Sequence, residues 1–335
     1  MTPLEEIIAS AKSNPQHIVM AEGEDPRIVE GSVRAVKHGL ARVTLLGSTD
    51  KVAKLLQDHG SNPDAVSIVD PARSPLLPEF AATYHDLRKH KGVDEDAARK
   101  AMSDPLGFAA MMVRKDEADG TIAGAVCTTG DTVRAAFQII GKAPGSKMVS
   151  SFFMMMFYQD HHPKKGVLFF SDCALIIDPD AEELAGIATA SARSFTAMTG
   201  KEPKVAMLSF STKGSARHER VTKVAEATRI AKELDPNLLI DGELQFDAAF
   251  VPSVNARKAP GSPIGADANV FVFPSLEAAN IGYKIAERIG GADAIGPVLQ
   301  GLNKPANDLS RGCDADDVYS LIAVTGVQAA NMDKK

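Results

Sequence analysis

Short apolar runs alternate along this chain with longer segments in which apolar residues recur at helical spacing. The short runs have the length of buried strands, and the long segments have the period of helices that bury one face. The strand-like runs are 17–21, 43–46, 66–69, 121–126, 167–170, 205–208, 238–240 and 270–273. The helical segments are 26–38, 50–58, 94–102, 105–115, 131–140, 181–199, 216–234, 276–289 and 314–330. This alternation predicts an α/β fold with mostly parallel sheets.

Prolines and capping residues support the predicted helices, and the chain length suggests two domains. Pro26 and Pro105 occupy first-turn positions, and each follows an aspartate suited to capping a helix. The length of 335 residues also favours two domains. The predicted boundaries give a first domain of 1–145 with 297–335, and a second, inserted domain of 146–296. Ligands of such folds bind in the cleft at the carboxyl ends of the strands.

The run from Met148 to Phe157 contains three consecutive methionines. A buried strand is the favoured interpretation, with a methionine-lined ligand surface as the alternative.

Composition narrows the class of protein. The net charge is -6, so a nucleic-acid-binding role has no electrostatic support. Three cysteines at unrelated spacings imply no disulfide framework. No apolar run is long enough to span a membrane, and Met1 to Lys12 lacks the pattern of a signal peptide. We therefore expect a cytoplasmic protein without a membrane partner.

Chemically active side chains are crowded between Asn307 and Asp317. A hydroxyl, a guanidinium, a thiol and several carboxylates fall within these residues. Ser310 and Arg311 are expected on a turn, followed by Asp314 at a helix N-cap. Such a turn can bind an oxyanion through backbone N–H groups and the guanidinium. The alternative is an ordinary cap beside a solvated arginine.

Three further segments carry polar groups in suggestive places. Thr128–Arg134 follows a strand and opens a helix, so it is either an anion site with Arg134 or a simple capping segment. Ser211–Ser215 resembles a phosphate loop only loosely, because the Walker pattern is missing. Arg88–Lys91 is a basic patch that is either a solvated helix face or a grip for a phosphorylated group.

Other common chemistries lack their signatures. The eight histidines pair with no Glu or Cys at metal-ligand spacing, so no metal site is expected. There is no G-x-S-x-G sequence to anchor a serine hydrolase and no G-x-G-x-x-G sequence to bind a dinucleotide.

Several blocks of sequence are similar to the phosphate acetyltransferases (phosphotransacetylases) of the phosphate acetyl/butyryltransferase family. The blocks are 131–134, 138–141, 209–215, 241–247, 258–263, 280–284, 301–305 and 307–313. They keep the order and spacing of that family over about residues 88–329. The resemblance implies transfer of an acetyl group between coenzyme A and inorganic phosphate. It also implies two α/β domains around a cleft, with the fold of isocitrate and isopropylmalate dehydrogenases.

The resemblance assigns roles to particular residues. The family's catalytic serine and arginine fall on Ser310 and Arg311, and its aspartate falls on Asp317. Its substrate-binding arginines fall on Arg134 and Arg88.

Three more candidate substrate-binding residues are Thr129, Lys284 and Asn307. The chain departs from its relatives before Asp131, where Cys127–Gly130 replaces the frequent His-Ser-Thr-Ala. The hydroxyl groups survive this change and the histidine does not.

The implied reaction is a direct transfer in a ternary complex, with arginines and a serine stabilising an anionic transition state. Asp317 as base for the thiol presents a mismatch, because an unperturbed Asp has a pKa of ~3.9 and a thiol one of ~8.5. Asp314 or Asp316 could share or replace its role. The rival route is an acyl-enzyme on Cys313.

Coenzyme A is expected as a substrate and no other cofactor is implied. The resemblance further implies acetyl-CoA, phosphate and acetyl phosphate as ligands, a homodimer, and acetate kinase as a partner in acetate metabolism. The alternatives are a phosphate butyryltransferase and a catalytically silent acyl-CoA or acetyl-phosphate-binding regulatory module.

Overall fold

The computed structural model describes residues 1–62 and 66–332, which form two compact units. The terminal unit comprises Leu4–Pro144 and Leu302–Lys335, and the central unit comprises Met1–Pro3 and Gly145–Gly301. Residues 63–65 and 333–335, which belong to the predicted first domain, lie outside the described part. Each unit is described by itself below.

The terminal unit contains a five-stranded sheet in the order β11-β4-β1-β2-β3, and every neighbouring pair is parallel. Its strands are β1 (Gln16–Met20), β2 (Ala41–Leu46), β3 (Ser67–Val69), β4 (Gly120–Ala123) and β11 (Ala306–Asp308). The chain leaves the central strand β1 toward β2 and β3, then returns to add β4 and β11 on the other side. A parallel sheet built in this way has a crevice at the carboxyl ends of the two strands where the direction reverses, here β1 and β4.

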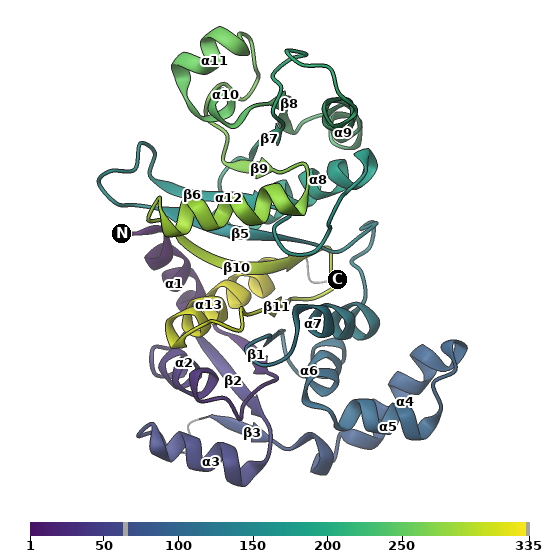
Figure 1. Cartoon of the computed structure of the whole chain (residues 1–335). Helices are drawn as coiled ribbons and strands as arrows, with labels where there is room; N and C mark the ends of the chain where they lie inside the picture. The colour runs from purple at the N-terminus through teal and green to yellow at the C-terminus, as the bar shows by residue number, and fades with distance from the viewer. Residues whose placement is uncertain (63–65, 333–335) are drawn as a thin grey trace. The chain divides into compact units, whose positions relative to one another are not determined.

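Helices cover both faces of this sheet. Figure 1 shows α2 (Pro26–Lys37) and α13 (Ala315–Asn331) side by side on one side of β1, with α6 (Pro105–Arg114) on the other. α2 and α13 approach closely at Gly31, where a Cβ atom would lie 2.6 Å from Val318 Cγ1. The remaining helices are α1 (Pro3–Ser13), α3 (Thr49–Asp58), α4 (Leu77–Arg88), α5 (Glu95–Ser103) and α7 (Thr129–Ala135), with a π-helical turn at Ala136–Ile140 and 3-10 turns at Pro71–Arg73 and Lys89–Lys91.

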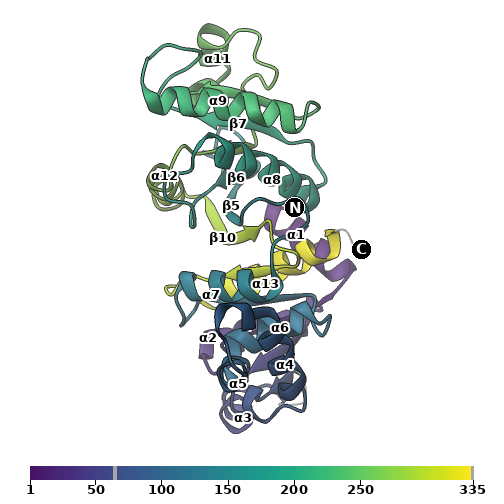
Figure 2. The same ribbon diagram turned by 90° about the vertical axis from the view of Figure 1, so that its right-hand side faces the viewer.

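The central unit contains a six-stranded sheet in the order β10-β5-β6-β9-β7-β8. Its strands are β5 (Ser150–Phe157), β6 (Gly166–Ser171), β7 (Lys204–Leu208), β8 (Leu239–Leu244), β9 (Val270–Val272) and β10 (Asp293–Gln300). Its helices are α8 (Ala181–Thr199), α9 (Glu219–Leu234), α10 (Phe246–Phe250), α11 (Pro252–Lys258) and α12 (Leu276–Arg288). Figure 2 shows α8 and α12 on opposite sides of the sheet.

Successive residues of the central strands pack against helices on opposite faces of this sheet. Phe169 stacks on Phe152 and meets Phe195 of α8, while Phe153 stacks on Tyr283 of α12. Side chains of a strand alternate between the two faces, so neighbouring phenylalanines of β5 serve opposite helix layers.

The predicted α/β class with mostly parallel sheets is confirmed. The departures are β10 with β5 and β5 with β6, which pair antiparallel. The methionine-rich run is confirmed as the buried strand β5. Of the helices in the described residues, none is long and apolar enough to cross a bilayer.

Candidate active site

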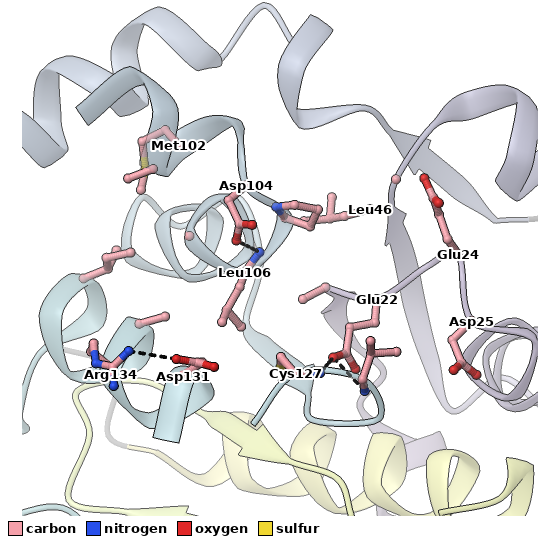
Figure 3. A pocket seen from close by; sticks show the side chains of 18 of the residues that line it. Glu22, Glu24, Asp25, Leu46, Met102, Asp104, Leu106, Cys127, Asp131 and Arg134 are labelled. Carbon is pink, nitrogen blue, oxygen red and sulfur yellow. Dashed lines mark hydrogen bonds and ion pairs between the residues drawn. The ribbon is translucent and has the colours of Figure 1, made fainter. Parts of the chain in front are cut away.

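The candidate site lies at the crevice of the terminal unit, where β1, β4 and β11 end. A cavity of about 950 Å³ opens beside it, at the ends of β1 and β2 and the loop after β4, and apolar side chains such as Leu46, Met102 and Leu106 line part of it. Residues of β11 and of the Ser310–Cys313 loop do not line this cavity. Figure 3 shows Glu22 pointing at the backbone of Cys127 on one side of this cavity. A strand-end crevice with apolar walls and a few polar groups is the usual form of a small-molecule site.

The carboxylates around the cavity are already engaged. Glu22 accepts hydrogen bonds from the N–H groups of Ala125, Val126 and Cys127, at 2.7, 3.0 and 2.7 Å. This interaction ties the loop after β4 to the end of β1. Asp104 caps α6 by accepting the Leu106 N–H at 3.0 Å, as the sequence predicted.

Arg27 braces three segments that meet at the site. Its guanidinium pairs with Asp25 at 2.8 Å and donates to the carbonyl of Ala125 at 2.9 Å. It also donates to the carbonyls of Arg311 and Cys313, at 2.8 and 3.1 Å. One side chain at the start of α2 therefore holds together the loops after β4 and β11. Sequence reasoning missed this role, since Arg27 lies far from either loop along the chain.

Ser310 and Arg311 lie in the exposed loop between β11 and α13. Arg311 Nη1 donates to the Cys127 carbonyl at 3.1 Å, so its guanidinium lies against the loop after β4. Ser310 Oγ accepts the Gly312 N–H at 3.3 Å. The guanidinium of Arg311 is thus held against the loop after β4 by its hydrogen bond to the Cys127 carbonyl.

The three aspartates that follow have different partners. Asp314 is the N-cap of α13, as predicted, and accepts the N–H groups of Asp316 and Asp317. Asp317 is exposed, and its carboxylate accepts the Asp314 N–H at 3.0 Å, which completes a capping box. Asp316 pairs with Arg34 of α2 at 2.6 Å.

Arg134 lines the cavity, where it pairs with Asp131 at 2.8 Å, and the side chain is 64% exposed (Figure 3). Thr128 Oγ1 donates to Asp131 as well, at 2.7 Å, and accepts its N–H. The segment therefore has the capping arrangement that the sequence left as an alternative, while Arg134 remains accessible to a ligand in the cavity.

Thr129 donates from its hydroxyl to Asp308 Oδ2 at 2.6 Å. Arg88 is the last residue of α4, and its buried Nε has no hydrogen-bond partner. Arg88 does not line the cavity, although Tyr84, one turn earlier, does.

Lys284 belongs to α12 of the central unit, where its ammonium lies 5.2 Å from the Tyr283 ring centroid. Asn307 is fully buried, and its amide donates to Thr325 and Gln328 of α13, each at 2.9 Å. Because that amide joins β11 to α13 and faces no solvent, the structure gives no support to its predicted role in substrate binding.

The loosely phosphate-loop-like segment 211–215 binds its own neighbours. Glu243 accepts the Gly214 N–H at 2.7 Å and the Ser211 hydroxyl at 2.8 Å. Ser215 Oγ accepts the Thr212 N–H at 3.0 Å. The donors that would hold a phosphate are thus used to fix the loop.

Asp308 is a site residue that the sequence did not single out. It is the last residue of β11 and is 1% exposed. Burial raises the pKa of its carboxyl to about 6. From the sequence, an aspartate beside a turn is expected to be solvated. The only sequence sign of a functional role was therefore its position two residues before Ser310.

Both cysteines near the site are protonated at neutral pH. Burial raises the pKa of the Cys127 thiol to about 12 and that of Cys313 to about 11. Within the described residues, no group of three or more His, Cys, Asp or Glu side chains could hold a metal ion.

Comparison with known proteins places this arrangement in a class. The fold is that of a phosphotransacetylase structure from Streptococcus pyogenes, at a TM-score of 0.91 and 43% identity over 97% of each chain. A structure described as a 4-hydroxythreonine-4-phosphate dehydrogenase from Salmonella typhimurium shares the fold alone, with a TM-score of 0.52 and 12% identity over 93% of this chain and 99% of that one. The predicted dehydrogenase-like architecture is thereby confirmed.

The sequence comparisons name the family. A family model described as phosphate acetyl/butaryl transferase matches residues 3–326. A phosphate acetyltransferase from Paracoccus denitrificans is 49% identical over 328 residues, covering 98% of this chain and 99% of the relative. The chain therefore belongs to the phosphate acetyl/butyryl transferase family, as its motifs predicted.

Proposed function

We propose that the chain transfers an acetyl group reversibly between coenzyme A and inorganic phosphate. The transfer is direct, within a ternary complex of acetyl-CoA and phosphate or of coenzyme A and acetyl phosphate. The observation that carries this proposal is the joining of the loops after β4 and β11, where Arg311 reaches the Cys127 carbonyl and Thr129 reaches Asp308. These loops bring a guanidinium and hydroxyl groups to one strand-end crevice.

The chemistry needs cations that are in place before the reaction begins. Attack on the carbonyl creates a tetrahedral oxyanion among phosphate charges, and preorganised donors stabilise such a charge most effectively. Arg311 binds the phosphate and the developing oxyanion, and Ser310 donates a hydrogen bond to it. Arg134 and Arg88 bind the anionic groups of the substrates.

Asp317 is the proposed base for the coenzyme A thiol. Its carboxylate is exposed and lies one turn into α13, just beyond the Ser310–Cys313 loop. The Asp314 N–H that it accepts fixes the carboxylate relative to that loop.

The covalent route through Cys313 receives little support. The Cys313 side chain is 5% exposed, and its raised thiol pKa leaves almost no thiolate at neutral pH. Nucleophilic catalysis by cysteine requires the thiolate.

The deciding experiment is phosphate-dependent loss of acetyl-CoA, followed at the thioester absorbance, with acetyl phosphate identified as the product. Absence of this reaction would leave the silent ligand-binding module, and a preference for butyryl-CoA would make the chain a phosphate butyryltransferase. A homodimer in the cytoplasm, working with acetate kinase in acetate metabolism, completes the proposal.

A further inference from the structure

Asp308 is a buried carboxyl that the proposed reaction does not yet use. It ends β11, and its Oδ2 accepts the hydroxyl of Thr129 at 2.6 Å. Thr129, the first residue of α7, is half-buried, and its hydroxyl is the group that contacts Asp308. Asp308 has no direct access to solvent or substrate, because it is 1% exposed.

The second carboxyl oxygen is unusually isolated. Asp308 Oδ1 is buried and has no hydrogen-bond partner. It packs against Gly124 at the end of β4, where a Cβ atom would lie 2.3 Å from it. A buried carboxylate without donors on one oxygen is costly, so these surroundings favour the neutral acid.

The groups that face Asp308 come from each neighbouring segment. α7 contributes the hydroxyls of Thr129 and Thr132, which favour the ionised form. Glu22 after β1 opposes ionisation through its charge, and Arg311 after β11 favours it. Burial outweighs the other effects and brings the pKa to about 6, so both protonation states exist near neutral pH.

We propose that Asp308, acting through the Thr129 hydroxyl, supplies the proton that phosphate takes as it leaves acetyl phosphate. The same pair accepts that proton when phosphate attacks acetyl-CoA. This inference rests on the proposed acetyl transfer and adds to it the group that protonates phosphate.

The chemistry requires such a donor. When the thiolate sulfur bonds to the acetyl carbon, the carbon–oxygen bond to phosphate breaks and its electron pair remains on the phosphate oxygen. Acetyl phosphate dianion would then release a phosphate trianion, which is a poor leaving group. Positioned proton transfer removes this barrier. The oxygen takes the Thr129 hydroxyl proton, and Thr129 takes the proton of Asp308.

The hydrogen bond between Thr129 and Asp308 allows proton transfer in both directions of the reaction. With Asp308 ionised, Thr129 donates to it and presents lone pairs outward, ready to accept a proton. With Asp308 neutral, the carboxyl donates to Thr129 and the hydroxyl is free to donate outward. Arg311, held at the Cys127 carbonyl, is the cation that binds the phosphate near this hydroxyl.

The test compares two acetyl donors with the full-length chain. Acetyl phosphate releases a group that needs a proton, whereas acetyl methyl phosphate releases methyl phosphate dianion, which needs none at neutral pH. For Asp308→Asn and Thr129→Val we expect kcat with acetyl phosphate to fall about 100-fold. Because methyl phosphate leaves without needing a proton, we expect kcat with acetyl methyl phosphate to fall less than about threefold. Thr129→Ser, which keeps the hydroxyl, should retain most of the wild-type rate with both donors.

A second readout is the pH profile of acetyl-CoA formation, which should lose its alkaline limb in Asp308→Asn. The matched control is Asp172→Asn, which removes a buried carboxylate of the central unit that backbone N–H groups surround. It should leave the donor ratio and the pH limb unchanged. Equal losses with both donors in Asp308→Asn would make Asp308 merely structural and overturn the relay. An inactive wild-type chain would instead refute the proposed function itself.

Discussion

The pH dependence of the unfolding free energy measures how much ionisation of the buried Asp308 carboxyl destabilises the fold. Its folded-state pKa of about 6 stands above the usual aspartate value of 3.8. A group with a raised folded-state pKa contributes stability below its unfolded pKa, and that contribution is lost as the pH rises through about 6. The difference of about 2 pKa units corresponds to about 3 kcal/mol at 1.36 kcal/mol per unit.

Asp308→Asn removes this titration. We therefore expect the variant to gain stability relative to the wild type as the pH rises, by about 2 kcal/mol between pH ~4.5 and ~7.5. The remainder of the ~3 kcal/mol has already developed below that range, because the unfolded carboxyl titrates there. Other carboxylates titrate in both proteins and cancel in the difference.

The assay is urea unfolding of wild type and Asp308→Asn at matched pH values. The signal should come from a probe in the terminal unit, since two units need not unfold together. A difference in unfolding free energy that stays constant from pH 4.5 to 7.5 would refute the raised pKa. The same variant should be more stable and less active, which is the pattern of a residue kept for function.

Three further outcomes test the architecture of the site. Arg27→Gln should lower kcat by about 100-fold, because misplacing reacting groups by about 1 Å has effects of that size; Arg34→Gln, on the same helix with an exposed ion pair, should stay within about twofold. Equal losses in these two variants would contradict the bracing role of Arg27. Arg311→Gln should lose mainly kcat and Arg88→Gln mainly apparent affinity, as measured by steady-state kinetics with coenzyme A as the varied substrate. Similar changes of both parameters in both variants would refute separate roles for the two arginines. Cys313→Ser should keep its activity, and the wild type should show no acetyl-CoA/CoA exchange without phosphate; an inactive variant together with exchange by the wild type would support the covalent route.

Features of the fold that depend on neighbours in sequence could be predicted. Asp25 and Asp104 were expected to cap helices, and each accepts a backbone N–H two residues later. The helix 181–199 was predicted with the bounds that α8 has. Apolar periodicity and capping are local properties, so these elements are readable without knowing the tertiary structure.

Elements that depend on distant partners could not be predicted in the same way. β11 is three residues long, polar at Asn307 and Asp308, and becomes a strand only by pairing with β4. β10 contains Gly296 and Pro297, where the sequence predicted a domain boundary rather than a strand. The strand expected to reach Val126 stops at Ala123, because Gly124 has a φ of 105° and the chain then turns toward Glu22.

The same distinction separates the parts of the site. The Ser310–Arg311 pair could be proposed from the sequence because it lies in an unusual local motif. Asp308 stands two residues away, and its identity was visible, yet its environment was not. That environment arises where the end of β4 presents a glycine, α7 presents a hydroxyl, and β11 carries the carboxyl between them. A protonation state is a property of such an assembly rather than of a motif. Sequence therefore indicates which groups can react, and the packing of three segments decides which of them can hold a proton near neutral pH.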